Sequence, residues 1–146
     1  MIAVTLDLNS ANMKHLRRQM DMIPKRMRRR CIKAALRDAY KIYIKEAKAR
    51  CPKGDVDRLY GKYPHKKGNL RRSISFKWLR APQGSARVIV GPRSGKNEKF
   101  DGYYGKFVEQ GTSKLQAKPF MKPAFLSKKG AMEQAIERKL EQGLYG

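Results

Sequence analysis

The chain has 146 residues, 40% of them hydrophobic and 32% charged, and its 35 lysines and arginines outnumber 12 acids to give a formal net charge of +23. This length fits one domain over residues 1–146 with a modest core, and the basic excess indicates contact with polyanions or acidic protein surfaces. No apolar stretch approaches the length of a membrane span and the N-terminus lacks a secretion signal, so we expect a protein made and kept in a cytoplasm, with no membrane partner.

The N-terminal half predicts one strand followed by two helices. Apolar and polar residues alternate over 2–8, which is the period of a half-buried strand. Apolar residues from Met13 to Ile23 then recur at helical spacing, and Pro24 separates this helix from the next. Residues 25–50 carry the longest helical pattern, with an apolar stripe on one side and lysines and arginines on the others. This long basic helix is the dominant predicted element.

The second half predicts a hairpin and a last helix, with flexible loops at about 52–69 and 94–102. Residues 70–80 and 85–92 favour strands, and the turn-rich segment between them makes a hairpin the natural pairing. The last helix is expected to start at Pro123, and Gly143 and Gly146 are expected to mark its fraying end. The predicted fold class is therefore α+β, a small antiparallel sheet packed by helices. The apolar face of the last helix carries Phe125, Met132, Ile136, Leu140 and Leu144.

No constellation of residues predicts catalysis or metal binding. His15 and His65 lack ligand spacing to each other or to cysteine, and a metal site needs three or four convergent donors. Cys51 lies near many lysines, which could lower the pKa of its thiol, but no base partner accompanies it. Asp55 and Asp57 fall in a predicted loop, and keeping that loop solvated is a simpler role for them than acid–base chemistry. We expect no enzyme activity, no metal and no cofactor.

Two dense basic runs are the candidates for nucleic-acid contact. Residues 25–30 and 65–72 are rich in cations, and Tyr60 and Tyr63 precede the second run. Basic grooves with stacking aromatic side chains suit single strands, and arginines alone suit phosphate contact that ignores base sequence. A solvated basic surface is the open alternative. The candidate phosphate or acidic-partner contacts are Arg28, Arg29, Arg30, Lys66, Lys67, Arg71 and Arg72.

Residues 103–125, YYGKFVEQGTSKLQAKPFMKPAF, predict a tight corner before the last helix. The spacing of Tyr104, Phe107 and Val108 predicts a short helix with an aromatic face. Gly111 permits a left-handed turn that ends this helix, and Thr112 can hydrogen-bond the turn backbone. The segment is therefore expected to set the direction of the chain.

Glu109 is the single acid of this corner. We expect it to accept backbone N–H groups or to pair with a cation, because a buried carboxylate needs such partners and their loss is destabilising. Pro119 and Pro123 each fix a backbone angle and extend the chain ahead of the last helix. These residues are expected to act in packing rather than in chemistry.

The same stretch resembles the signature of the neck or tail-completion proteins of phages and prophages with long non-contractile tails. In that family an aromatic-x-x-Phe-Val-Glu-x-Gly-Thr segment precedes Ala-x-Pro-Phe-x-x-Pro-Ala. A second similar piece is GNLRRSI, residues 68–74, which follows a long basic helix ending in Cys51 and Pro52, although residues 53–67 form an insertion between them. The matching positions are Tyr104, Phe107, Val108, Glu109, Gly111, Thr112, Ala117, Pro119, Phe120, Pro123 and Ala124.

The resemblance implies a non-enzymatic structural protein of the virion, located at the head–tail joint and assembled in the cytoplasm of the bacterial host. Such proteins form homo-oligomeric rings, commonly hexamers, that connect the portal or head-completion complex to the tail terminator and tail tube. No cofactor is implied, and nonspecific contact with genomic DNA is compatible with the charge. The alternative function is that of a small basic protein that binds nucleic acid without sequence preference.

A closed ring needs one patch of each copy to meet a different patch of the next. Glu133, Glu137 and Glu141 lie at i, i+4 and i+8 of the last predicted helix and could face the arginine-rich helix of a neighbour. A solvated stripe with local lysine partners is the simpler interpretation.

Overall fold

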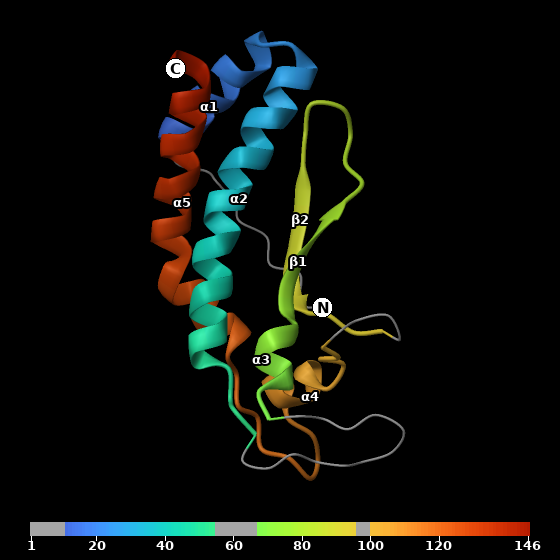
Figure 1. The fold of residues 1–146 in the computed structure, drawn as a ribbon. Helices are drawn as coiled ribbons and strands as arrows, with labels where there is room; N and C mark the ends of the chain where they lie inside the picture. Colours follow the sequence, from blue (N-terminus) through green and yellow to red (C-terminus); the bar gives the residue numbers. More distant parts are fainter. Residues whose placement is uncertain (1–10, 55–66, 96–99) are drawn as a thin grey trace.

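A computed structural model describes residues 11–54, 67–95 and 100–146 (Figure 1). The predicted strand at 2–8 and the central parts of the loops predicted at 52–69 and 94–102 lie outside these residues. The described residues contain helices and one two-stranded antiparallel sheet, so the predicted α+β class is confirmed.

Three helices form one side of the molecule. Helix α1 spans Ala11–Met22, α2 spans Lys25–Arg50 and α5 spans Met121–Tyr145, with α5 lying along α2 for most of its length (Figure 1). The first two helices confirm the sequence predictions. In α5 the predicted apolar face also packs inward, with Met132, Ile136 and Leu140 buried.

The opposite side of α2 carries the sheet. Strands β1, Ile74–Leu79, and β2, Arg87–Pro92, pair in antiparallel register from Ile74 opposite Pro92 to Leu79 opposite Arg87. Alternate residues of β1 face the helix, as the period of two predicts. The ring of Tyr40 on α2 stacks on Phe76 at 4.1 Å and meets Trp78 edge-on at 6.1 Å. Helix α2 is thus the middle layer between α5 and the hairpin.

The prediction places the start of the first hairpin strand at residue 70, which is too early. Residues Asn69–Ser73 form the short helix α3, and β1 starts only at Ile74. Local hydrogen bonds explain this difference, because the N–H of Arg72 donates to the carbonyl of Gly68 at 3.1 Å and the hydroxyl of Ser73 donates to that of Leu70 at 2.6 Å. Gly68, with φ of 75°, starts the turn in a conformation that suits glycine.

The predicted end of α5 is right for one glycine and wrong for the other. The helix ends at Tyr145 with Gly146 as its C-cap, whereas Gly143 lies inside the helix. A Cβ atom at Gly143 would lie 2.8 Å from Sγ of Cys31, so glycine permits the close approach of α5 to the start of α2. The hydroxyl of Tyr145 also forms a hydrogen bond with the side chain of Gln19 on α1. Both contacts hold the C-terminal turn against the other two helices.

The lower end of the hairpin packs closely on helix α4, Gly105–Gln110 (Figure 1). A Cβ atom at Gly105 would lie 2.7 Å from Cγ of Pro92 and 2.9 Å from Cδ1 of Leu70. Real Cβ atoms essentially never approach this closely. A side chain at position 105 would therefore separate α4 from the sheet.

Replacing glycine by alanine should have opposite effects on stability at positions 105 and 130. Gly105→Ala should lower the free energy of unfolding by roughly 1–3 kcal/mol, because the extra methyl overpacks the contact with Pro92 and Leu70. Gly130→Ala should raise it by about 0.5–1 kcal/mol, because this exposed position in α5 has open space around it and alanine favours a helix. Urea denaturation followed by circular dichroism measures both values. Equal effects of the two substitutions would contradict the packing of α4.

Candidate functional site

Glu109 lies at the centre of the corner between α4 and α5. Its side chain is buried, and its carboxylate accepts three backbone N–H groups, those of Phe120 at 2.7 Å, Met121 at 2.9 Å and Lys122 at 2.9 Å. These N–H groups lie at the start of α5, where backbone N–H groups have no hydrogen-bond partners within the helix. Phe120, the residue that precedes the helix, offers no side-chain cap of its own. Glu109 therefore caps α5 from eleven or more residues away.

This capping explains why α5 starts at Met121 rather than at Pro123, as the sequence had predicted. The carboxylate satisfies the backbone of Phe120, Met121 and Lys122, so the helix can begin before the proline. Pro123 then sits in the first turn, where its missing N–H removes no helical hydrogen bond. The negative charge also interacts favourably with the positive end of the helix dipole.

The turn between the two helices depends on Gly111. This residue has φ of 75° and ψ of 176°, a conformation essentially restricted to glycine. The positive φ agrees with the prediction, although the extended ψ differs from that of a left-handed helical turn. A Cβ atom there would lie 2.8 Å from the backbone nitrogen of Ala117. The hydroxyl of Thr112 accepts the N–H of Leu115 at 3.0 Å, which is the predicted backbone contact of this side chain.

The residues of the signature divide into an inner and an outer set. Glu109, Phe120 and Ala124 are buried, and Tyr104, Val108 and Pro123 are partly buried. The predicted aromatic face is only half right, because Phe107 points outward and is 49% exposed. The exposed members of the set are Phe107, Thr112, Ala117 and Pro119.

Two buried groups of the core face the same corner. The hydroxyl of Tyr43 donates to the carbonyl of Met121 at 3.2 Å, and its pKa is raised by burial and by the charge of Glu109. Burial raises the pKa of the Cys51 thiol to about 11, against a lowering by the charge of Arg71 and a further rise from Glu109. This direction is opposite to the one suggested by the lysines near Cys51 in the sequence. The thiol is thus protonated and buried at neutral pH.

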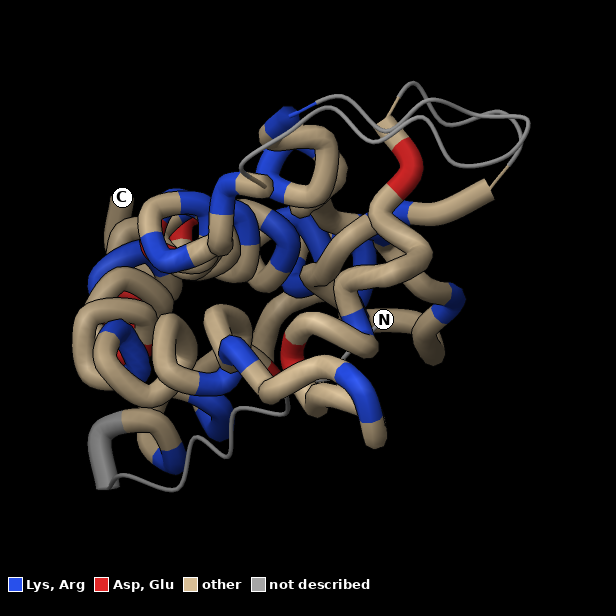
Figure 2. Tube along the Cα trace, turned by 90° about the horizontal axis from the view of Figure 1, so that it is seen from below, with Lys and Arg blue, Asp and Glu red and all other residues tan. Residues whose placement is uncertain are grey.

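The predicted basic contacts do not form one surface. Arg28 donates to the carboxylate of Asp21 at 2.8 Å and to its backbone carbonyl at 3.0 Å, so its role is to join α1 to α2. Arg29 and Arg30 are exposed nearby, and Lys66 lies outside the described residues. Figure 2 shows lysines and arginines spread over the described chain, with few acidic positions between them.

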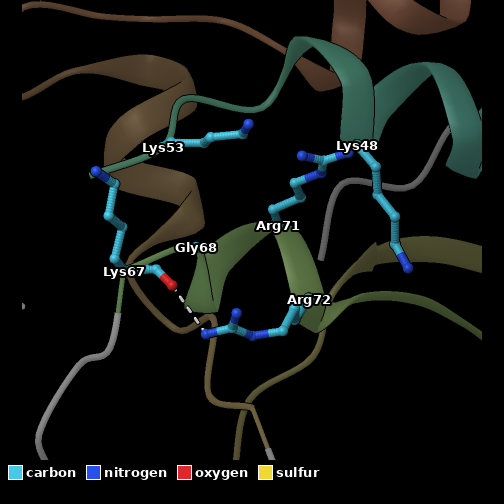
Figure 3. A pocket seen from close by; sticks show the side chains of 6 residues that line it. All are labelled: Lys48, Lys53, Lys67, Gly68, Arg71 and Arg72. Atoms are coloured by element: carbon cyan, nitrogen blue, oxygen red, sulfur yellow. Dashed lines mark hydrogen bonds between the residues drawn. The ribbon is translucent and has the colours of Figure 1, made fainter. Parts of the chain in front are cut away.

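A second group of cations surrounds a pocket at the other end of α2. The pocket has a volume of about 410 Å³, and Figure 3 shows its lining from the end of α2, the segment after it and α3. Twenty residues of helix separate Arg28 from Lys48, which places the two basic groups about 30 Å apart. Sequence reasoning named three of the cations and missed Lys48 and Lys53, which belong to no dense basic run. The lining residues are Lys48, Lys53, Lys67, Gly68, Arg71 and Arg72.

No group of three or more histidines, cysteines or acids is placed to hold a metal ion in the described part of the chain. None of the described helices is both long and apolar enough to cross a membrane.

The fold is that of a small basic α+β protein whose last helix is capped by a buried glutamate from a short preceding helix. Residues 14–111 match the family model described as "Bacteriophage HK97-gp10, putative tail-component". The chain belongs to this HK97 gp10-like family and is a structural component related to the phage tail, and hence of the virion. The match includes Glu109 and Gly111 and ends before the proline-bracketed part of the corner. No curated protein and no solved structure matches the chain.

Removing the cap should destabilise the protein. Glu109→Ala leaves the N–H groups of Phe120, Met121 and Lys122 without their acceptor inside the protein, and we expect a loss of roughly 3 kcal/mol in the free energy of unfolding. The matched control is Glu141→Ala, which removes an exposed carboxylate from α5 and should change stability by less than about 0.5 kcal/mol. Urea denaturation of both variants measures the difference. A loss for Glu109→Ala no larger than the control's contradicts the capping role.

Cys51 should contribute to the loss of stability at alkaline pH. Its folded pKa, about 11, lies above the ordinary value of 9.0, so between these values the folded state binds more protons than the unfolded state. Stability must then fall as the pH rises through this range. Cys51→Ala should make the fall between pH 9 and pH 11 shallower by on the order of 1–2 kcal/mol. Cys31→Ala is the control, and an equally steep fall in Cys51→Ala and the wild type refutes the assignment.

Proposed function

We propose that this protein is a non-enzymatic ring component of the head–tail joint, which connects the portal or head-completion complex to the tail terminator and tail tube. The family match carries the proposal, because it identifies the chain as a phage tail component. The resemblance of the corner to the neck and tail-completion signature supports the more specific position at the joint. The ring is homo-oligomeric, and a hexamer is the proposed copy number.

Phe107, an exposed member of the signature, and the exposed residues Tyr103 and Leu115 near it in the sequence supply a surface for the neighbouring subunit. The side chain of Phe107 is 49% exposed and that of Leu115 is 45% exposed. Gly111 lies between them in the sequence, and its backbone N–H donates to the carbonyl of Phe107 at 2.8 Å. Tyr103, next to the start of α4, is 56% exposed. Large apolar side chains gathered on a rigid corner are typical of surfaces that bind another protein. A ring closes when this patch meets a different patch on the next copy.

The structure of the corner suits an assembly role. Glu109 fixes α4 to α5, and Gly111 turns the backbone between them, so the exposed side chains of Phe107 and Leu115 are carried on a fixed frame. A preorganised surface loses less conformational freedom when it binds a partner. The buried residues of the signature thus hold the corner, and the exposed side chains of Phe107 and Leu115 make the contacts.

The alternative is a small basic protein that binds nucleic acid without sequence preference. The net charge of +23 favours contact with polyanions whatever the assembly state. Size-exclusion chromatography with light scattering, followed by negative-stain imaging, separates the two functions. Rings, alone or with head-completion and tail-tube proteins, support the joint. A monomer that binds polynucleotide tightly and never assembles with these proteins contradicts it.

Phe107→Ser combined with Leu115→Ser should abolish ring formation and leave the fold intact, because both side chains are already half exposed in the monomer. The matched control is Met22→Ser with Met27→Ser, which removes two exposed apolar side chains near the junction of α1 and α2. The control should assemble like the wild type. Light scattering of the two double variants gives the mass of each species, and assembly of the Phe107/Leu115 variant would falsify the proposed contact surface.

A further inference from the structure

The pocket between the end of α2 and α3 is strongly basic. Five of its six described lining residues, all except Gly68, are lysine or arginine, and none of the six is an acid. Its volume of about 410 Å³ falls within the range of ligand-binding pockets. Like charges gathered around one cavity repel each other, and an anion bound among them relieves that repulsion.

Three cations of the pocket lack an acidic partner in the described part of the chain, because no ion pair there joins Lys48, Lys53 or Arg71 to an acid. The nearest acid on α2 is Glu46, two residues before Lys48, and it pairs with Arg50 at 2.7 Å and with Lys128 at 3.8 Å. Asp101, whose backbone carbonyl accepts a hydrogen bond from Asn69 of α3, uses its carboxylate to accept the N–H of Tyr103 at 3.0 Å.

One cation of the pocket is held in place before any ligand arrives. The guanidinium of Arg72 donates to the carbonyl of Lys67 at 2.8 Å, as the dashed line in Figure 3 shows. The guanidinium also lies over the ring of Phe100, with its Cζ atom 5.1 Å from the ring centre. Arg71 extends from α3 toward the end of α2 (Figure 3). A fixed guanidinium offers a planar set of donors that matches the oxygens of a phosphate group.

We propose that this pocket binds the phosphate backbone of nucleic acid without regard to base sequence. Among the described residues, the lining contains no aromatic ring for a base to stack on, and no asparagine, glutamine or acid to read a base edge. Lysines and arginines around a cavity therefore recognise the charge and shape of the phosphates. This inference does not rest on ring formation.

Fluorescence anisotropy with two labelled 20-base-pair DNA duplexes of unrelated sequence tests the proposal. We expect equal affinity for both and a steep decrease with salt, because binding releases counterions. Lys53→Gln with Arg71→Gln should weaken binding about tenfold and reduce the slope of log K against log salt by about two. A strong preference for one duplex overturns the proposal.

The matched control is Arg80→Gln with Arg87→Gln, which removes the same charge from exposed residues at the turn end of the hairpin. Strand β1 separates that end from α3 by about 20 Å. The control should weaken binding less than threefold, and equal losses in the two variants would show general attraction and no pocket. If the Arg71 variant fails to fold, Lys48→Gln with Lys53→Gln leaves α3 unchanged and should give the same result.

A competition experiment separates nucleic acid from an acidic protein partner. Poly-glutamate should displace the labelled duplex only at a much higher concentration of charge than unlabelled DNA does. Displacement at equal charge concentration, lost in the Lys53/Arg71 variant but kept in the Arg80/Arg87 control, would assign the pocket to an acidic peptide and overturn the proposal.

Discussion

The carboxylate of Glu109 determines how the second half of the chain is arranged. It is buried and accepts three successive N–H groups at the start of α5, so the position of α4 fixes both the start and the direction of the last helix. Helix α5 in turn packs along α2, which carries the hairpin on its other side. One charged residue therefore connects the hairpin end of the molecule to its helical layer. This dependence explains an acid in the interior of so basic a protein.

Patterns of apolar residues were sufficient to predict the larger elements. The spacing in residues 25–50 predicted α2, and the alternation of Ile74, Phe76 and Trp78 predicted the face of β1 that packs on Tyr40. The boundaries were less accurate, because they depend on hydrogen bonds that periodicity does not contain. Because Glu109 caps the backbone at Phe120, α5 starts earlier than predicted. Residues Asn69–Ser73 form a helix after the turn at Gly68, although their sequence also suits a strand.

The candidate sites show the same limit. Sequence reasoning expected Glu109 to accept backbone N–H groups or to pair with a cation, but the particular helix that it caps depends on a contact between segments. It grouped Arg28 with Arg29 and Arg30, and it did not predict the ion pair that Arg28 forms with Asp21. Lys48 and Lys53 join the pocket only because the chain brings the end of α2 beside α3. Charge density along a sequence is therefore a poor guide to charge density in space.

The packing of α5 along α2 also affects synthesis. The apolar face of α2, Lys25–Arg50, leaves the ribosome well before its packing partner α5, Met121–Tyr145, has been synthesised. During most of translation this face has no native cover from α5, so the nascent chain is exposed to aggregation or to capture by a chaperone. Capping by Glu109 must also wait, because the residues whose N–H groups it binds are synthesised after Glu109 itself. Native packing of the helical layer must therefore follow the synthesis of α5.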